Sequence, residues 1–536
     1  MRASPVSGSL GPIDRLADLV DTLAGAWAPR AASTTTTGQE RAILRLFGIR
    51  GLGRGGRPLA WEVVDRYAGQ HPGRLGGGVG LPFAMALREY DVPAQQLALD
   101  VASGAVDLGL EAELLRQSDR RAVAEVEARR LADAALERID ANRTARRELT
   151  DLLGDLPPPW LGMTLPEATG EPAVVAAQGW IRAGIDVLRV EVPAGWELAS
   201  HHRESGTTAP GIAAAPDRLV DEAWEPAPAG SQRALAALRQ AIDEAAAERG
   251  SYVRLATAAP PLAAPEQAVV AAFERVDLVE LDPMAEIVDG AVDPDRALAD
   301  QAFAGRLLDR CGAMVLVGGG PLVVAPDMLA GFPSDEATRA GRALALQLLG
   351  VALARATGLP AERIVAAALP TWSADAPGPT ARALADVVVR RALLPGHPLA
   401  FVESPEQSES TPRWPFIVAG VMAAAGDTAL VLPRPGERGR IVRDGRSAAA
   451  VAADLRPSGM TGMALDGPAR EHAQASVAAA VTTLELLGDR GWSSLVADRT
   501  SRTEGEPSRL GADAVAERTE PFDPFGSTHP ADAPGR

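Results

Sequence analysis

The chain has 536 residues, 46% of them hydrophobic, and a formal net charge of −17 at pH 7. A chain of this size can bury a large core, whereas its acidic character argues against nucleic acid or an anionic membrane surface as the main partner. All 53 basic residues are arginine, so this chain offers no lysine for a Schiff base or a P-loop.

The first predicted region, residues 1–155, has apolar residues at spacings of three and four, the pattern of amphipathic helices. Near its start, Thr37 is predicted to cap a helix, with Glu40 completing the capping box. Pro157-Pro158-Pro159 ends the region, because proline cannot continue a helix. The predicted helices are Glu40–Phe47, Trp61–Tyr67, Leu81–Tyr90, Ala94–Val101 and Glu111–Leu149.

The second predicted region, residues 156–490, alternates short apolar runs with helical segments. Eight such units favour a parallel (β/α)₈ TIM barrel, an α/β fold, over an open sheet. Residues 491–536 are polar and rich in proline, and are predicted to form a partly disordered tail. The predicted strands are 160–165, 186–192, 252–258, 277–282, 313–319, 363–369, 398–404 and 428–434.

The single cysteine, Cys311, can form neither an internal disulfide nor a zinc site and fits a reducing cytoplasm. The N-terminus lacks the apolar core of a signal peptide, and apolar runs such as Ala313–Val317 are too short to span a bilayer. No metal-spaced His/Asp cluster is present. We therefore predict a cytoplasmic protein that uses neither a membrane nor a metal ion.

Candidate site residues lie at the predicted strand ends, where TIM barrels place their chemistry. The carboxylates there suit acid/base work or amine binding, or else they cap helices and pair with arginines. The glycines present backbone N–H groups to a phosphate, or else they make a tight turn. Arg254, inside a strand, is a ligand group or a buried ion-pair partner. The candidates are Glu191, Arg254, Thr257, Asp282, Gly318, Gly319, Glu403 and Ser404.

A set of short motifs runs in order along nearly the whole chain and resembles the large (alpha) subunit of lysine 5,6-aminomutase, including related ornithine 4,5-aminomutase barrels. No single motif is specific, but the collinear set is. It comprises TT-x-x-x-x-ERA-x-x-RL from Thr34, VVDR from Val63, GRLGGGVGLPFAMAL from Gly73, ASGAVDL from Ala102, ALERIDANRTARRE from Ala135, YVRL from Tyr252, ERVD from Glu274, DQ-x-F from Asp300, TGLP from Thr357, LLPGHPL from Leu393 and PFDPF from Pro521.

The resemblance implies a TIM barrel with helical extensions that works with a small B12-binding beta subunit. That partner would carry adenosylcobalamin and the lysine that binds pyridoxal phosphate, so the absence of lysine here is expected. The implied reaction is a radical 1,2-amino shift on an amino acid substrate. No catalytic residue of this chain follows from the resemblance.

The chain departs from the family at positions where polar residues are expected. These are Ala256–Pro261, Val192–Glu197, Asp289-Gly290-Ala291 and about Ala368. A phosphate needs donors, and these replacements remove them. Two hypotheses follow: an aminomutase-type alpha subunit with a changed substrate, or a catalytically degenerate barrel that serves in binding or assembly.

Overall fold

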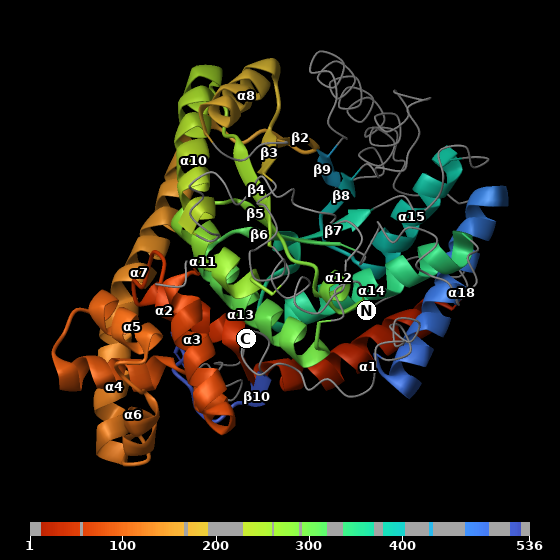
Figure 1. Cartoon of the computed structure of the whole chain (residues 1–536). Helices are drawn as coiled ribbons and strands as arrows, with labels where there is room; N and C mark the ends of the chain where they lie inside the picture. Colours follow the sequence, from red (N-terminus) through yellow and green to blue (C-terminus); the bar gives the residue numbers. More distant parts are fainter. Residues whose placement is uncertain are drawn as a thin grey trace, which may run out of the picture.

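The computed structural model describes residues 12–53, 57–165, 170–190, 229–259, 262–288, 292–318, 336–368, 379–402, 428–432, 467–492 and 515–526. Its centre is a closed barrel of eight parallel strands in sequential order, which confirms the predicted TIM barrel (Figure 1). The last strand pairs with the first, Trp160 opposite Leu430. The strands are β2 Trp160–Leu165, β3 Val187–Val190, β4 Arg254–Ala258, β5 Leu278–Glu280, β6 Met314–Val317, β7 Ile364–Ala368, β8 Leu399–Val402 and β9 Thr428–Leu432.

Two hydrophobic cores follow from the alternation of side chains along these strands. Val187, Leu278 and Leu316 belong to a small cluster that fills the barrel interior. Their neighbours Leu188, Val279 and Val315 belong to the large cluster between the strands and the helices. Alternate residues of each strand therefore point inward or outward, and this decides which of the two cores a residue belongs to.

The helices after the strands cover the outside of the barrel. Segments α14 and α18 pack against each other and against α1, and α11 packs against α13 and α2. None of the described helices is long and apolar enough to cross a membrane. The covering elements are α8 Gly170–Ala183, α10 Ala229–Arg249, α11 Ala264–Phe273, α12 Pro283–Val288, α13 Pro294–Cys311, α14 Glu336–Ala356, η5 Ala361–Arg363, α15 Pro379–Leu393 and α18 Gly467–Arg490.

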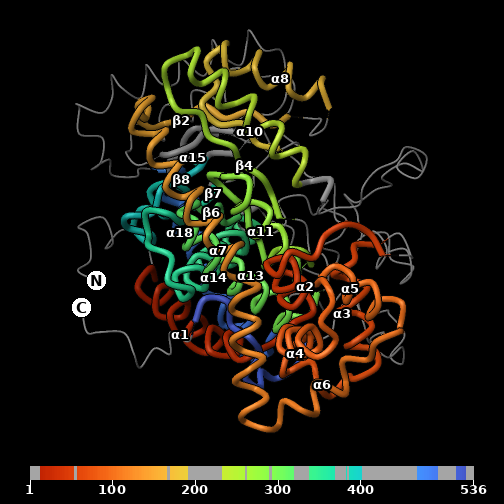
Figure 2. Tube along the Cα trace, turned by 90° about the vertical axis from the view of Figure 1, so that its left-hand side faces the viewer, coloured from red at the N-terminus to blue at the C-terminus, as the bar shows by residue number. Residues whose placement is uncertain are grey.

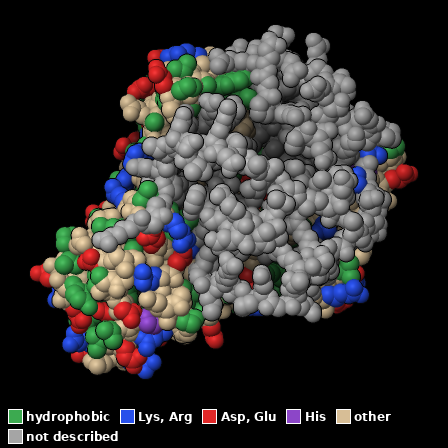
Figure 3. All heavy atoms as spheres, viewed as in Figure 1, with side chains coloured by type: hydrophobic (Ala, Val, Ile, Leu, Met, Phe, Trp, Pro, Cys, Tyr) green, Lys and Arg blue, Asp and Glu red, His purple; other side chains and the backbone are tan. Residues whose placement is uncertain are grey.

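Helices α2 to α6 form a group beside the barrel, and α7 runs from this group along the barrel wall (Figures 1 and 2). Helix α1 lies apart from the group and packs against α13, α14 and α18. Charged side chains of both signs are interspersed on the described surface of this group (Figure 3), as expected for solvated helix faces. The elements are α1 Ile13–Ala32, α2 Thr37–Leu46, α3 Leu59–Gln70, η2 Pro72–Gly77, α4 Gly80–Tyr90, α5 Ala94–Ser103, α6 Gly109–Leu114 and α7 Ser118–Leu153.

Two details of the helix predictions are wrong. The predicted helix Glu111–Leu149 is two helices, because the chain becomes extended at Gln117 before Ser118 and Asp119 start a new first turn. The N-cap of α2 is Thr36, whose side chain accepts from the N–H of Gln39, and not Thr37. Glu40 does not close a capping box, because its carboxylate accepts from the N–H groups of Val79 (2.6 Å) and Gly80 (3.1 Å).

The start of α2 is fastened to α13 of the barrel by a buried polar contact. Thr36 donates to one oxygen of Asp300, and Arg296 donates to the other oxygen (2.7 Å) and to the hydroxyl of Thr37 (2.9 Å). Gly38 must be glycine, because a Cβ there would lie 2.7 Å from the Asp300 carboxylate. The opening threonines and the DQ-x-F motif are therefore two halves of one contact.

The C-terminal segment 515–526 completes this arrangement. Strand β10, Val515–Glu517, pairs antiparallel with β1, Thr34–Thr36. Phe522 is buried, and its ring centre lies 5.5 Å from that of Phe47. The ring centre of Phe525 lies 5.3 Å from that of Phe303 of the DQ-x-F motif, with the two rings tilted by 59°. We call the contacts of residues 34–46, 296–303 and 515–526 the junction. It ties residues 34–46 and 515–526 to helix α13 of the barrel.

Candidate functional site

The C-terminal ends of the barrel strands hold an ion pair in the barrel interior. Arg189 donates to Glu280 at 2.7 Å, with 19% and 30% of the two side chains exposed. Arg189 lies two residues after Val187, and Glu280 two residues after Leu278, so both share the inward face of the interior cluster. The pair is thus directed into the barrel near its mouth.

Small residues on the strand between them allow this pair to form. Arg189 is aligned with Ala256 of β4, and Glu280 with Ala258. Strands β3 and β5 are two strand spacings apart, about 10 Å. The long arginine side chain can cross that distance only because the alanines leave the space above β4 open.

A hydroxyl and a second carboxylate lie at the same end of the barrel. Thr164, buried on β2, is aligned with Arg189. Asp282 follows β5, and one of its oxygens accepts from the N–H of Ala285 (3.0 Å), which caps α12. Its other oxygen is so close to the end of β6 that a Cβ on Gly318 would lie 2.4 Å from it. We call Thr164, Arg189, Glu280 and Asp282 the mouth cluster.

The mouth cluster combines one positive and two negative formal charges with a hydroxyl. A guanidinium binds a carboxylate in a planar, two-bond geometry, and carboxylates bind an ammonium group. Both interactions are strengthened where water is partly excluded. This set of groups is therefore suited to a molecule that carries an amine and a carboxylate.

A buried carboxyl group, that of Glu286 on α12, lies four residues after Asp282. Burial raises the pKa of Glu286 on α12 to about 8, although the N–H of Leu262 donates to it at 3.2 Å. The neighbouring charge of Asp300 acts in the same direction as burial, while Arg296 opposes it. The raised pKa of Glu286 favours its protonated form at neutral pH.

The structure corrects two of the predicted site residues. Thr257 lies at the end of β4, but strand parity turns it outward, where it accepts from Gln267 of α11 (3.4 Å). Arg254 lies at the opposite, N-terminal end of β4, where it contacts the Asp155 carboxylate at 2.6 Å and stacks 3.6 Å from the Trp160 ring centre. Of the two roles predicted for Arg254, ligand group or buried ion-pair partner, the structure shows the second. Its side chain does not reach the rim.

Two of the other predicted site residues lie at the mouth, and four cannot be placed. Asp282 caps a helix, which was one of the two roles predicted for the rim carboxylates, and it lies next to Gly318 at the mouth. Glu191, Gly319, Glu403 and Ser404 lie outside the described residues. Arg189 and Glu280 were missed, although each is a charged residue at an alternate position of an apolar strand, DVLRVEV and DLVELD. That pattern is the signal that would have revealed them.

Comparison with known proteins yields a family model for the larger part of the chain. The model describes the TIM-barrel domain of the alpha subunit of D-lysine 5,6-aminomutase and matches residues 12–407. The lysine 5,6-aminomutase alpha subunit of Fusobacterium nucleatum subsp. nucleatum is 26% identical over 335 residues, which are 62% of this chain and 59% of the relative. That of Acetoanaerobium sticklandii is 26% identical over 330 residues, 62% and 58% of the two chains.

Solved structures resemble the chain more distantly. A dihydropteroate synthase from Anaplasma phagocytophilum has a TM-score of 0.35 and 16% identity, and covers 54% of this chain and 98% of that chain. A methanol:cobalamin methyltransferase complex from Methanosarcina barkeri has a TM-score of 0.32 and 10% identity, and covers 65% and 82%. The matches to the curated relatives span about three fifths of their length. By the family model and its extent, the chain belongs to the family of lysine 5,6-aminomutase alpha-subunit TIM-barrel domains.

Proposed function

We propose that this chain is the substrate-binding barrel of an amino acid aminomutase that works with a separate B12-binding beta subunit. Family membership supports the reaction class, a 1,2-amino shift. The observation that carries the proposal for this chain is the Arg189–Glu280 pair inside the barrel mouth. A cytoplasmic location remains a prediction from the sequence.

In this proposal the mouth cluster orients an amino acid by both of its charged ends. Arg189 binds the substrate carboxylate, and Glu280 and Asp282 hold an ammonium group. The names of the relatives point to lysine, whose second ammonium group lies several bonds from its carboxylate. Fixing both ends places the carbon atoms between them in one position, and such positioning is the main contribution that a protein makes to cofactor chemistry.

The described residues do not fit the phosphate of pyridoxal phosphate. A phosphate dianion requires several positive or N–H donors, whereas the mouth cluster has two carboxylates and one arginine that is already paired. The chain also has no lysine for a Schiff base. We therefore assign pyridoxal phosphate and adenosylcobalamin to the partner chain and derive no step through them.

The second candidate function is a catalytically degenerate barrel that binds or assembles without turnover. It is favoured by the orientation of two predicted rim groups, since Thr257 faces a helix and Arg254 lies at the far end of the barrel. Both functions allow the barrel to bind an amino acid. Only the aminomutase requires a complex that also holds the two cofactors.

Titration calorimetry with L-lysine and L-ornithine tests the binding step. We expect Arg189→Gln and Glu280→Gln each to weaken binding by about tenfold or more, because each removes a charge-assisted contact. Glu137→Gln, on an exposed face of α7, is the matched control and should leave binding unchanged. Equal affinity of all variants would exclude the mouth cluster as the substrate site.

Co-expression with a small B12-binding chain that carries a pyridoxal lysine separates the two functions. A complex with cobalamin and pyridoxal absorbance that isomerises the bound amino acid supports the aminomutase. A stable complex that binds neither cofactor contradicts it and leaves the binding role.

A further inference from the structure

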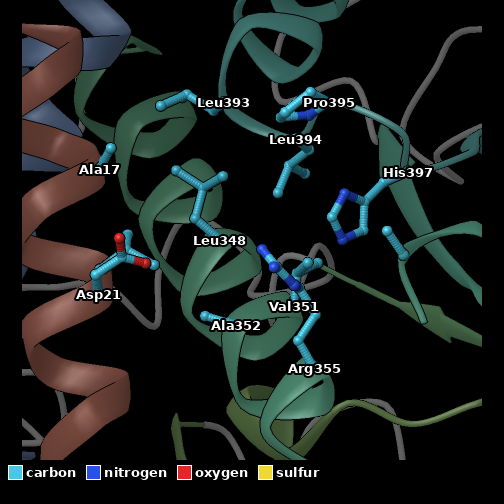
Figure 4. Close-up of a pocket in the computed structure, with 12 residues that line it drawn as sticks. Ala17, Asp21, Leu348, Val351, Ala352, Arg355, Leu393, Leu394, Pro395 and His397 are labelled. Atoms are coloured by element: carbon cyan, nitrogen blue, oxygen red, sulfur yellow. The ribbon is translucent and has the colours of Figure 1, made fainter. Parts of the chain in front are cut away.

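A cavity of about 170 Å³ lies at the other end of the barrel from the mouth cluster. It is open to solvent on one side and is lined by α1, by the C-terminal half of α14, by the last residue of α15, and by the segments that lead into β7 and β8 (Figure 4). Segments that lead into parallel strands lie at the N-terminal face of a barrel. We call this cavity the N-face pocket.

The walls of the N-face pocket are mainly aliphatic. Its volume is close to that of an engineered protein cavity, about 150 Å³, that holds a benzene molecule. A molecule of about six to eight non-hydrogen atoms therefore fits. The apolar lining residues are Val20, Leu348, Val351, Leu393, Leu394 and Pro395.

One polar side chain in this apolar setting lacks a partner. His397 is 4% exposed, and neither of its ring nitrogens makes a hydrogen bond within the described residues. Burial, and then the positive charge of Arg355, lower its pKa, whereas backbone contacts with Pro395 and Leu394 and the negative charge of Glu362 act in the opposite direction. Those backbone contacts do not meet the geometry of a hydrogen bond. The neutral ring carries one N–H donor and one acceptor, and a buried donor without a partner is unfavourable. A ligand that accepts a hydrogen bond would satisfy it.

Two charged side chains flank the pocket on different helices. Arg355 comes from the last turn of α14, and Asp21 comes from α1. Figure 4 shows Arg355 and His397 extending into the same space, with Asp21 on the side of α1. Across the described part of the chain, the side chains of Arg355 and Asp21 take part in no ion pair or hydrogen bond. The guanidinium is thus available to an anion.

We propose that the N-face pocket binds a small aliphatic monocarboxylate. The carboxylate accepts from Arg355 and from the His397 ring, and the hydrocarbon body lies against Leu348, Val351 and Leu394. A hydrocarbon would leave His397 without a partner, and an inorganic anion would leave the aliphatic walls uncovered. Asp21 repels a second carboxylate, so dicarboxylates bind more weakly than monocarboxylates.

Titration calorimetry on the full-length chain with three probes tests this assignment. We expect 4-methylpentanoate to bind with one-to-one stoichiometry, about tenfold or more tightly than its neutral counterpart 4-methylpentan-1-ol. Glutarate should bind about tenfold more weakly than 4-methylpentanoate. No heat from 4-methylpentanoate at concentrations up to about 10 mM, or equal affinity for acid and alcohol, overturns the proposal.

Substitutions then locate the site. Arg355→Gln should remove the preference for the acid over the alcohol, and Asp21→Asn should raise the affinity for glutarate severalfold. The matched controls Arg147→Gln on α7 and Asp18→Asn, one turn from Asp21 on α1, should change neither value. Glu280→Gln should also change neither value, which separates this site from the mouth cluster. An acid preference that persists in Arg355→Gln overturns the assignment.

Discussion

The junction and the barrel mouth use polar side chains in opposite ways. In the junction, Arg296 and Asp300 are fully buried and hydrogen-bonded to each other and to the first residues of α2. In the mouth, Arg189 and Glu280 form one ion pair that is still partly open to solvent. Buried polar groups that are fully paired hold a structure together, whereas accessible groups can exchange their partner for a ligand.

This difference shows to which part of the molecule three of the family motifs belong. The opening threonines, the DQ-x-F motif and the PFDPF motif all meet in the junction. Their resemblance to the family therefore concerns the attachment of the N-terminal helices to the barrel. Arg189 and Glu280, which we propose to bind the substrate, lie on strands β3 and β5, outside these motifs.

The largest expected effect comes from breaking the junction at Arg296. Arg296→Met leaves Asp300 buried without its cation, so we expect a loss of about 3–5 kcal/mol in the free energy of unfolding. Urea unfolding measures it. Arg116→Gln, which breaks a pair whose arginine is 74% exposed, should cost less than about 0.5 kcal/mol. Similar losses of unfolding free energy in the two variants would contradict the idea that the buried pair of the junction stabilises the fold more than an exposed pair.

A second change releases the C-terminal segment from the junction. Phe522 is buried and packs on Phe47, so Phe522→Ala should cost about 3 kcal/mol. Hydrogen exchange should become faster in β1 and β10, which this segment pairs. Phe525→Ala, at a partly exposed ring, is the control and should cost less. Unchanged exchange in β1 would show that Phe522 does not anchor the pairing.

A third effect depends on pH and is smaller than the first two for each pH unit. Because the native pKa of Glu286 is about 8 against an ordinary 4.5, the stabilisation linked to its proton is complete below about pH 4.5 and is lost as the pH rises to about 8. Between these values, wild type should lose up to about 1.4 kcal/mol per pH unit relative to Glu286→Gln. Urea unfolding of both at several pH values measures the difference. A constant difference, as expected for the control Glu137→Gln, would contradict a raised pKa.

The smallest effect on stability is expected in the mouth. Arg189→Gln should change the free energy of unfolding by less than about 1 kcal/mol, because the ion pair is partly solvated. The same variant should lose most of its affinity for the amino acid. Unfolding and binding measured on one preparation test both statements. A large loss of stability would place Arg189 with the structural residues of the junction.

The candidate site was only partly predictable from the sequence. Asp282 and Gly318 were correctly placed at strand ends, because the ends of eight apolar runs are readable. Thr257 and Arg254 were misplaced, because a shift of one residue turns a side chain outward and a shift of a few residues moves it to the other end of the barrel. Arg189 and Glu280 were missed because they lie inside the predicted strands 186–192 and 277–282, whereas the candidates were sought at the strand ends.

The sequence by itself determined the eight strands, the closed barrel and the family, because apolar periodicity and ordered motifs are properties of the chain alone. Only the tertiary structure decided which residues meet. Thr36 and Asp300 are 264 positions apart, and His397 and Val20 line one cavity from distant segments. Such contacts arise from strand register and helix packing, which bring together side chains whose separation along the chain carries no signal.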